Sequence, residues 1–199
     1  MNTGCLEELL PDNATRQELL AWYNDFPARA LSLATPSPSP LLLNVAGLPG
    51  AGKTTLALNI LEEHPHLFYI SFDRLMEEMP PYRETLRQGG PREAFARWEQ
   101  PARLLGYRLL EAGLARRLSI LFEHGNAAPE HLDLYRRARS AGYRVEIRFI
   151  DVETRTAIER IRQRERFFPE EAVAERHALL LALNEEYKKI VNTFEIIRT

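Results

Sequence analysis

The sequence has 199 residues, enough for one domain with a short extension, and its 45% hydrophobic content can form a substantial core. Its net charge of −2 does not suggest binding to nucleic acid or anionic membranes, and no apolar run is as long as a membrane-spanning helix. The first residues lack a signal-peptide pattern, and Cys5, the only cysteine, can form no internal disulfide. We therefore expect a cytoplasmic protein without nucleic-acid or membrane partners.

The N-terminal 40 residues differ in composition from the rest of the chain. We expect residues 5–34 to be helical, with a capping box from Thr15 to Glu18 followed by a broad apolar face. Residues 32–40 alternate proline with small polar residues, as in an extended, semi-rigid linker. The sequence thus predicts a helical extension and Pro/Ser linker over residues 1–40 and one domain over 41–199. We expect the extension to pack on that domain, with gating of its site as the alternative.

From residue 41 onward, strands and helices alternate. The expected strands cover residues 41–46, 67–72, 118–122, 143–150 and 194–197. Long helices are expected over 92–117, with a weak point at Gly106, and over 129–141. Such alternation predicts an α/β fold, with a parallel sheet and helices on both faces. Ligands of these sheets bind at the carboxyl ends of the strands.

Residues 47–54, Gly-Leu-Pro-Gly-Ala-Gly-Lys-Thr, match the P-loop (Walker A) pattern G-x-x-x-x-G-K-[ST] in full. The expected strand before them and helix after them are the context that this motif requires. Glycines let the chain wrap around phosphates, while backbone N–H groups and the positive end of the helix face the anion. Lys53 is expected beside the β- and γ-phosphates of ATP, and the Thr54 hydroxyl on Mg²⁺. The candidate nucleotide-binding residues are Gly47, Leu48, Pro49, Gly50, Ala51, Gly52, Lys53, Thr54 and Thr55.

Carboxylates follow the next two expected strands. Glu123 follows an apolar strand, the general form of a Walker B element, and is a candidate for the Mg²⁺ site together with Thr54. Asp73 is the candidate general base that accepts the proton of an attacking hydroxyl. The alternative is that Asp73 caps the helix after it.

An arginine cluster follows the fourth strand, at positions 155, 160, 162, 164 and 166. On a helix, Arg162 and Arg166 would share one face, and Arg160 and Arg164 another. Local acidic residues are too few to pair with them all, which suggests that an anion completes the set. We predict a lid that closes Arg162 and Arg166 over a transferring phosphoryl group. A charged surface helix is the alternative.

Missing motifs narrow the class of P-loop protein. The chain has no N-K-x-D motif of a GTPase and no L-S-G-G-Q-like signature of an ABC ATPase, and it hardly accommodates the helical lid domain of a larger AAA+ machine. A compact P-loop kinase that uses ATP and Mg²⁺ remains. The alternatives are a polynucleotide 5′-hydroxyl kinase, whose basic channel would use arginines between positions 74 and 108, and a nucleotide-gated protein whose N-terminal helix recruits a partner.

Four segments together resemble the zeta-toxin group of P-loop kinases: residues 47–55, 71–73, 121–123 and 168–176. Residues 72–80 are also similar to a stretch of chloramphenicol phosphotransferase, and the overall resemblance covers about residues 41–198. It implies that Asp73 is the base, that Arg162 and Arg166 lie near the lid arginines, and that the acceptor is UDP-N-acetylglucosamine, a related small molecule or an antibiotic. An antitoxin or another protein is a candidate partner at the N-terminal helix. Residues 123–126 are Glu-His-Gly-Asn, where the group typically has Glu-Gly-Thr.

Taken together, these patterns predict a P-loop NTPase fold with a five-stranded parallel sheet in the order 2-3-1-4-5. The expected reaction is transfer of the ATP γ-phosphoryl group to a hydroxyl of a small molecule.

Overall fold

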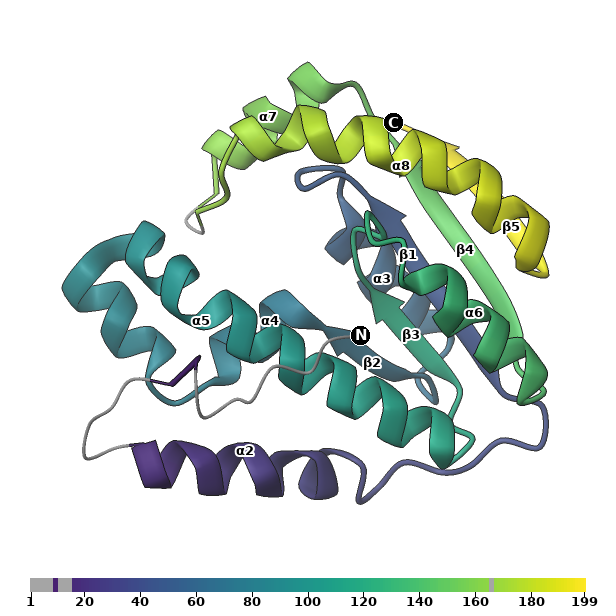
Figure 1. The fold of residues 1–199 in the computed structure, drawn as a ribbon, viewed down its shortest axis with the longest axis horizontal. Coiled ribbons are helices and arrows are strands. Elements are labelled where there is room, and N and C mark those ends of the chain that lie inside the picture. The colour runs from purple at the N-terminus through teal and green to yellow at the C-terminus, as the bar shows by residue number, and fades with distance from the viewer. Residues whose placement is uncertain (1–8, 11–15, 165–166) are drawn as a thin grey trace.

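The computed structural model describes residues 9–10, 16–164 and 167–199 (Figure 1). Its strands are β1 (Leu41–Gly47), β2 (Phe68–Ser71), β3 (Ile120–Glu123), β4 (Arg144–Asp151) and β5 (Thr193–Arg198). Its helices are α2 (Arg16–Ala30), α3 (Lys53–Glu63), α4 (Phe72–Glu78), α5 (Tyr82–Ala115), α6 (His131–Ser140), α7 (Thr154–Arg162) and α8 (Glu171–Ile190).

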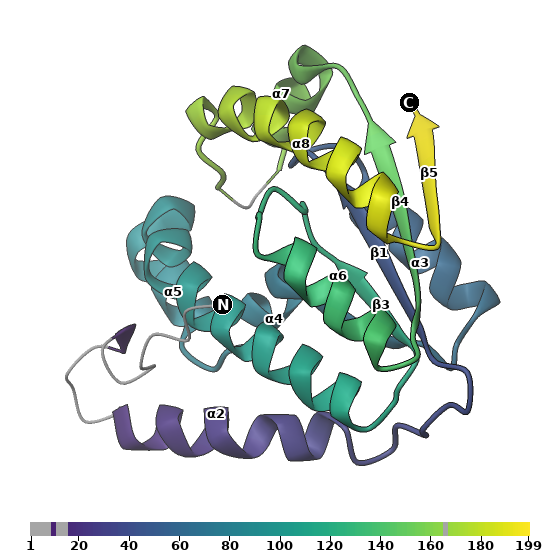
Figure 2. The ribbon, with the colours of Figure 1, turned by 45° about the vertical axis from the view of Figure 1, so that its right-hand side comes forward.

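The five strands form one parallel sheet in the order β2-β3-β1-β4-β5, which confirms the predicted fold class. The central strands β1 and β3 are almost completely buried, as expected for strands covered on both faces. Helices α3 and α6 lie on opposite faces of the sheet (Figures 1 and 2). The carboxyl ends of β1, β2 and β3 therefore meet at one edge, where the predicted site residues follow them.

Helix α5 consists of two helices joined at Gly90, whose φ of 77° and ψ of 179° are not helical. Its second half runs through Gly106 without a break, so the expected weak point there is wrong. A Cβ atom on Gly106 would lie 2.3 Å from the ring of Phe72. Glycine at position 106 therefore permits close packing of α5 against the start of α4, the helix that carries Asp73.

Helix α2 ends at Ala30, before residue 34, where the N-terminal helix was predicted to end. Leu9 is helical, whereas Leu10 lies in a bend, because a residue before proline disfavours helical backbone angles. Residues 5–8 and Thr15, the first residue of the predicted capping box, lie outside the described residues. Helix α2 packs along α5 (Figure 2), with a 2.8 Å hydrogen bond from Arg116 to the carbonyl of Leu31. Among the described residues, no helix is long and apolar enough to cross a lipid bilayer.

Helix α8 was not among the helices predicted from the sequence. Its buried residues include Val173, Leu180 and Tyr187, one on every second turn of one helix face. This helix covers the same face of the sheet as α6, which it contacts. It brings a stretch of chain far from the P-loop over the carboxyl ends of the strands (Figure 1).

Candidate active site

The segment between β1 and α3 has the backbone of a tight loop. Gly50 has a φ of 85°, and a Cβ atom at this position would lie 2.3 Å from the carbonyl oxygen of Ala157. Gly52 has a φ of 97°, but a Cβ there would meet nothing within 4 Å. Glycine is therefore required at position 50 for both conformation and close approach of α7, and at position 52 for conformation alone. The N-terminus of α3 directly follows the loop, as anion binding requires.

Lys53 folds back onto this loop. Its Nζ donates hydrogen bonds to the carbonyl oxygens of Gly47, at 3.2 Å, and Leu48, at 2.9 Å. The ammonium group also lines the cavity at the strand ends. This arrangement holds a compact positive charge beside the loop, where phosphates of a nucleotide would lie.

Thr54 and Glu123 are in direct contact. The Thr54 hydroxyl donates a 2.6 Å hydrogen bond to Glu123 Oε1, and the Tyr69 hydroxyl donates to Oε2. The Glu123 residue is only 5% exposed. Burial and the adjacent carboxylate raise the pKa of the Tyr69 hydroxyl, which keeps it a donor. Both oxygens of the carboxylate are thus held in place beside the P-loop.

This pair has the chemistry of a Mg²⁺ site, because Mg²⁺ prefers oxygen ligands. Among the described residues, no group of three or more His, Cys, Asp or Glu could hold a metal by itself. Mg²⁺ in kinases is bound by one or two protein oxygens together with substrate phosphates and water, so the pair fits this ion. The assignment of Thr54 and Glu123 to Mg²⁺ remains a prediction.

Asp73 lies in the first turn of α4 and lines the same cavity as Lys53, Thr54 and Glu123. The residue before it, Phe72, is buried, with its ring centroid 5.5 Å from that of Phe122. Ser71 rather than Asp73 occupies the N-cap position of α4. Asp73 is therefore not the N-cap residue of α4, and its role as general base remains a prediction.

The predicted lid arginines do not form one helical face, since α7 ends at Arg162. Arg162 donates hydrogen bonds of 2.9 and 2.8 Å to the two carboxylate oxygens of Glu170, so the expected shortage of acidic partners is wrong for this residue. Its side chain is 64% exposed and does not line the cavity of Asp73. Arg164 does line that cavity, whereas Arg166 lies outside the described residues.

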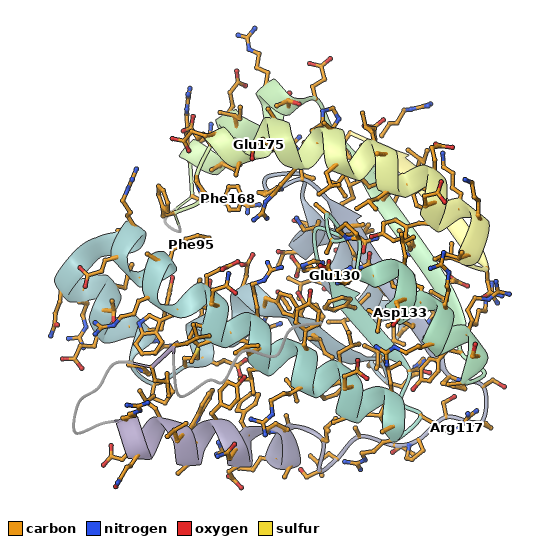
Figure 3. All side chains as sticks on the ribbon, viewed as in Figure 1. Phe95, Arg117, Glu130, Asp133, Phe168 and Glu175 are labelled. Carbon is orange, nitrogen blue, oxygen red and sulfur yellow. The ribbon has the colours of Figure 1, made fainter. Side chains whose placement is uncertain are left out.

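An aromatic contact joins α5 to the segment before α8. The Phe95 ring centroid lies 5.9 Å from that of Phe167 and 6.1 Å from that of Phe168. Figure 3 shows Phe95 and Phe168 facing each other across the opening between these elements. Both residues line the cavity together with Asp73, so the cavity has an aromatic wall on its outer side.

Further polar side chains line the cavity, although the sequence analysis did not assign them to the site: Glu99, Arg103, His124 and Arg176. Arg103 comes from α5, and Arg176 comes from α8, at the end of the segment 168–176 that resembles zeta toxins. His124 was noted only because it follows Glu123. In the structure, the backbone N–H of Asn126 donates a hydrogen bond to His124. The spacing of these residues in the sequence does not predict this contact.

The sheet order, the glycine loop and the Lys53, Thr54 and Glu123 arrangement define a nucleotide-binding P-loop protein with a kinase fold. The family model of the zeta toxin matches residues 28–197, and the chain belongs to this family of P-loop kinases. The match begins within α2, before the domain boundary predicted at residue 41.

Solved structures share this fold at low sequence identity. A chain from the PezAT chromosomal toxin–antitoxin system of Streptococcus pneumoniae is 17% identical, with a TM-score of 0.68 over 94% of this chain and 78% of that one. A chain of the AvrRxo1-ORF1:AvrRxo1-ORF2 structure with ATP is 17% identical, with a TM-score of 0.61 over 100% of this chain and 66% of that one. A putative kinase from Chloroflexus aurantiacus is 17% identical, with a TM-score of 0.56 over 81% of this chain and 89% of that one. The comparison with curated proteins gave no match.

Proposed function

We propose that this zeta-toxin family member transfers the γ-phosphoryl group of ATP to a hydroxyl group of a small molecule. The observation that carries the proposal is that Asp73 lines one cavity with Lys53 and with the Thr54–Glu123 pair. The acceptors to test first are UDP-N-acetylglucosamine, related sugar nucleotides and antibiotics with a free hydroxyl.

Each residue has a distinct task in this reaction. The loop N–H groups and Lys53 bind the phosphates of ATP, and Thr54 and Glu123 are the residues that would hold Mg²⁺. When bound, Mg²⁺ offsets negative charge on the β- and γ-phosphates. Asp73 accepts the proton of the acceptor hydroxyl as the new oxygen–phosphorus bond forms, while the bond between the γ-phosphorus and the bridging oxygen breaks and ADP leaves.

Arg162 and Arg166 remain the proposed lid arginines that stabilise charge on the transferring group. Arg162 would have to exchange its Glu170 partner for the phosphoryl group. That pair is exposed on the surface, where ion pairs contribute little stability, so the exchange is energetically accessible.

The polynucleotide kinase alternative has less support, because three of the α5 arginines contact different parts of the protein. Arg108 faces α2, where it donates to Asn24 and lies 4.9 Å from the Tyr23 ring. Arg92 lies instead on the ring of Phe167, and Arg103 pairs with Glu99.

A protein partner is part of the proposal. One similar structure comes from a toxin–antitoxin system, which supports a search for an antitoxin-like partner at α2. Growth arrest on expression, relieved by Lys53→Ala, would support a toxin. Phosphoryl transfer without toxicity would favour a role in resistance or metabolism instead.

The test of the reaction is a mass-spectrometric screen for the gain of one phosphoryl group. Wild-type protein and Lys53→Ala are each incubated with ATP, Mg²⁺ and a panel of UDP-sugars, antibiotics, nucleosides and short oligonucleotides. We expect a phosphorylated small molecule with wild type and none with Lys53→Ala. A phosphorylated oligonucleotide would favour the polynucleotide kinase, and ATP binding with slow hydrolysis and no product would favour a nucleotide-gated interaction protein.

A further inference from the structure

A recess beside the P-loop is bounded by the loop, the segment after β3, and helices α5 and α8. Its polar side chains are those of Arg103, His124 and Arg176, and among the described residues no carboxylate lines it. The same three side chains line the cavity that holds Asp73. A second cationic surface therefore adjoins the proposed site of phosphoryl transfer.

The charge of the two arginines is only partly balanced. Arg103 pairs with Glu99 at 3.2 Å, with both side chains at least three-quarters buried. Arg176 is half-buried, lies 4.8 Å from the Phe168 ring and has no ion pair with a described residue. Burial and the nearby charge of Arg103 lower the pKa of Arg176, while Glu99 and Asp73 offset part of this effect. The two partly desolvated guanidinium groups thus have one ion-paired carboxylate between them, that of Glu99. This excess of positive charge favours the binding of an anion.

His124 adds a neutral donor to this surface. Its Nδ1 accepts a 3.1 Å hydrogen bond from the backbone N–H of Asn126. Because the ring accepts at Nδ1, it carries its proton on Nε2. Among the described residues, Nε2 has no hydrogen-bond partner, and it is the nitrogen left to donate to a ligand.

Packing fixes the orientation of this ring. His124 stacks on Phe122 at 5.3 Å with an interplanar angle of 3°, and its centroid lies 4.6 Å from that of His131. Behind it, Asn126 Oδ1 accepts a 2.7 Å hydrogen bond from the Tyr135 hydroxyl and contacts His131 Nδ1 at 2.6 Å. The donor is therefore preorganised rather than mobile.

We propose that Arg103, Arg176 and His124 bind an anionic group, a phosphate or a carboxylate, that belongs to the phosphoryl acceptor. This inference rests on the proposed kinase function. The triphosphate of ATP already has the loop N–H groups, Lys53 and Mg²⁺ as counterparts. The loop contributes Gly47 and Pro49 to the recess, but its two cations come from α5 and α8, and Arg176 also lines the cavity of Asp73, the residue proposed to meet the acceptor.

The first test does not require turnover. The protein is saturated with Mg²⁺ and a nonhydrolysable ATP analogue, and inorganic phosphate is titrated in by calorimetry. We expect wild type to bind one phosphate, Arg176→Gln and Arg103→Gln to bind it at least about tenfold more weakly, and Arg87→Gln, an exposed α5 control, to match wild type. Absence of phosphate binding by the saturated wild type, or equal affinity in Arg176→Gln, would overturn the proposal even if the protein is a kinase.

The second test separates an acceptor from free phosphate. Phosphoryl transfer is measured with acceptors in matched pairs, such as UDP-N-acetylglucosamine and N-acetylglucosamine. We expect Arg176→Gln to raise the KM of the anionic acceptor by at least about tenfold and to leave the KM of ATP unchanged. A raised KM for ATP would assign the recess to the nucleotide, and an equal effect on both acceptors would mean that Arg176 does not recognise the anionic group; either result contradicts the proposal.

Discussion

The Thr54 hydroxyl donates a 2.6 Å hydrogen bond to Oε1 of Glu123, which joins the first turn of α3 to the end of β3. The hydroxyl of Tyr69, on the neighbouring strand β2, donates to the other oxygen of the same carboxylate. Three elements of the fold thus orient one carboxylate beside the P-loop. The proposed Mg²⁺ ligands are in place before a nucleotide binds.

We predict that Glu123→Gln lowers Mg²⁺-dependent turnover by about 10- to 100-fold. The amide keeps the size of the side chain but removes the negative charge and one acceptor oxygen. Initial rates measured across a range of Mg²⁺ concentrations would show the effect as a raised Mg²⁺ requirement. Tyr69→Phe, which removes one orienting hydrogen bond and retains the charge, serves as the matched control with a smaller effect. A Gln variant with the Mg²⁺ dependence of wild type would remove Glu123 from the proposed metal site.

The two loop glycines give a second prediction. Gly50→Ala should destabilise the protein more than Gly52→Ala, because a Cβ at position 50 meets the Ala157 carbonyl at 2.3 Å whereas position 52 is open. We expect about 1–2 kcal/mol for Gly52→Ala from its left-handed backbone alone, and about 1–3 kcal/mol more for Gly50→Ala from the clash. Thermal unfolding with and without ATP would measure both. Equal losses would mean that α7 moves away from the loop without cost.

Stability should also depend on pH through the buried histidines. Burial lowers the pKa of His131 from 6.5 to about 3, and that of His124 falls in the same direction. Below pH 6.5 the unfolded chain therefore binds protons that the folded protein does not, so stability falls as the pH drops from 6.5 toward 3. The expected slope is about 1.4 kcal/mol per pH unit for each such histidine.

Urea unfolding between pH 7 and pH 5 measures this slope. His131→Asn should reduce it by the share of one histidine, whereas His64→Gln, at an exposed position, should leave it unchanged. If His131→Asn does not fold, an NMR titration of the wild-type ring gives the same answer, since the ring should stay neutral at pH 5. A ring that titrates near pH 6.5 in the folded protein would refute the burial argument.

The fold and the P-loop could be predicted because their signals are local. Alternating strands and helices define a parallel sheet, and the eight residues from Gly47 to Thr54 specify the loop by themselves. Asp73 and Glu123 could be placed at the site because the carboxyl ends of parallel strands meet at one edge. None of these expectations needed the packing of distant helices.

The remaining lining of the cavity depends on tertiary packing. Arg103 and Arg176 reach the same cavity only because α5 and α8 converge over the sheet, and the resemblance of segment 168–176 gave Arg176 no role. The pairing of Arg162 with Glu170 likewise follows from the end of α7 and the turn into α8, not from helical spacing. A count of acidic residues within the arginine-rich segment could not include Glu170, which lies after that segment.

The central claim is that Asp73 is the general base of a phosphoryl transfer, and Asp73→Asn tests it most directly. Transfer from ATP to the acceptor found in the screen is measured together with ATP affinity, with Glu78→Gln, an exposed change on the same helix, as the control. We predict that Asp73→Asn lowers kcat by at least about 100-fold with ATP affinity near that of wild type, and that Glu78→Gln changes neither. An Asp73→Asn variant that still transfers the phosphoryl group at the wild-type rate, or one that no longer binds ATP, would contradict this account.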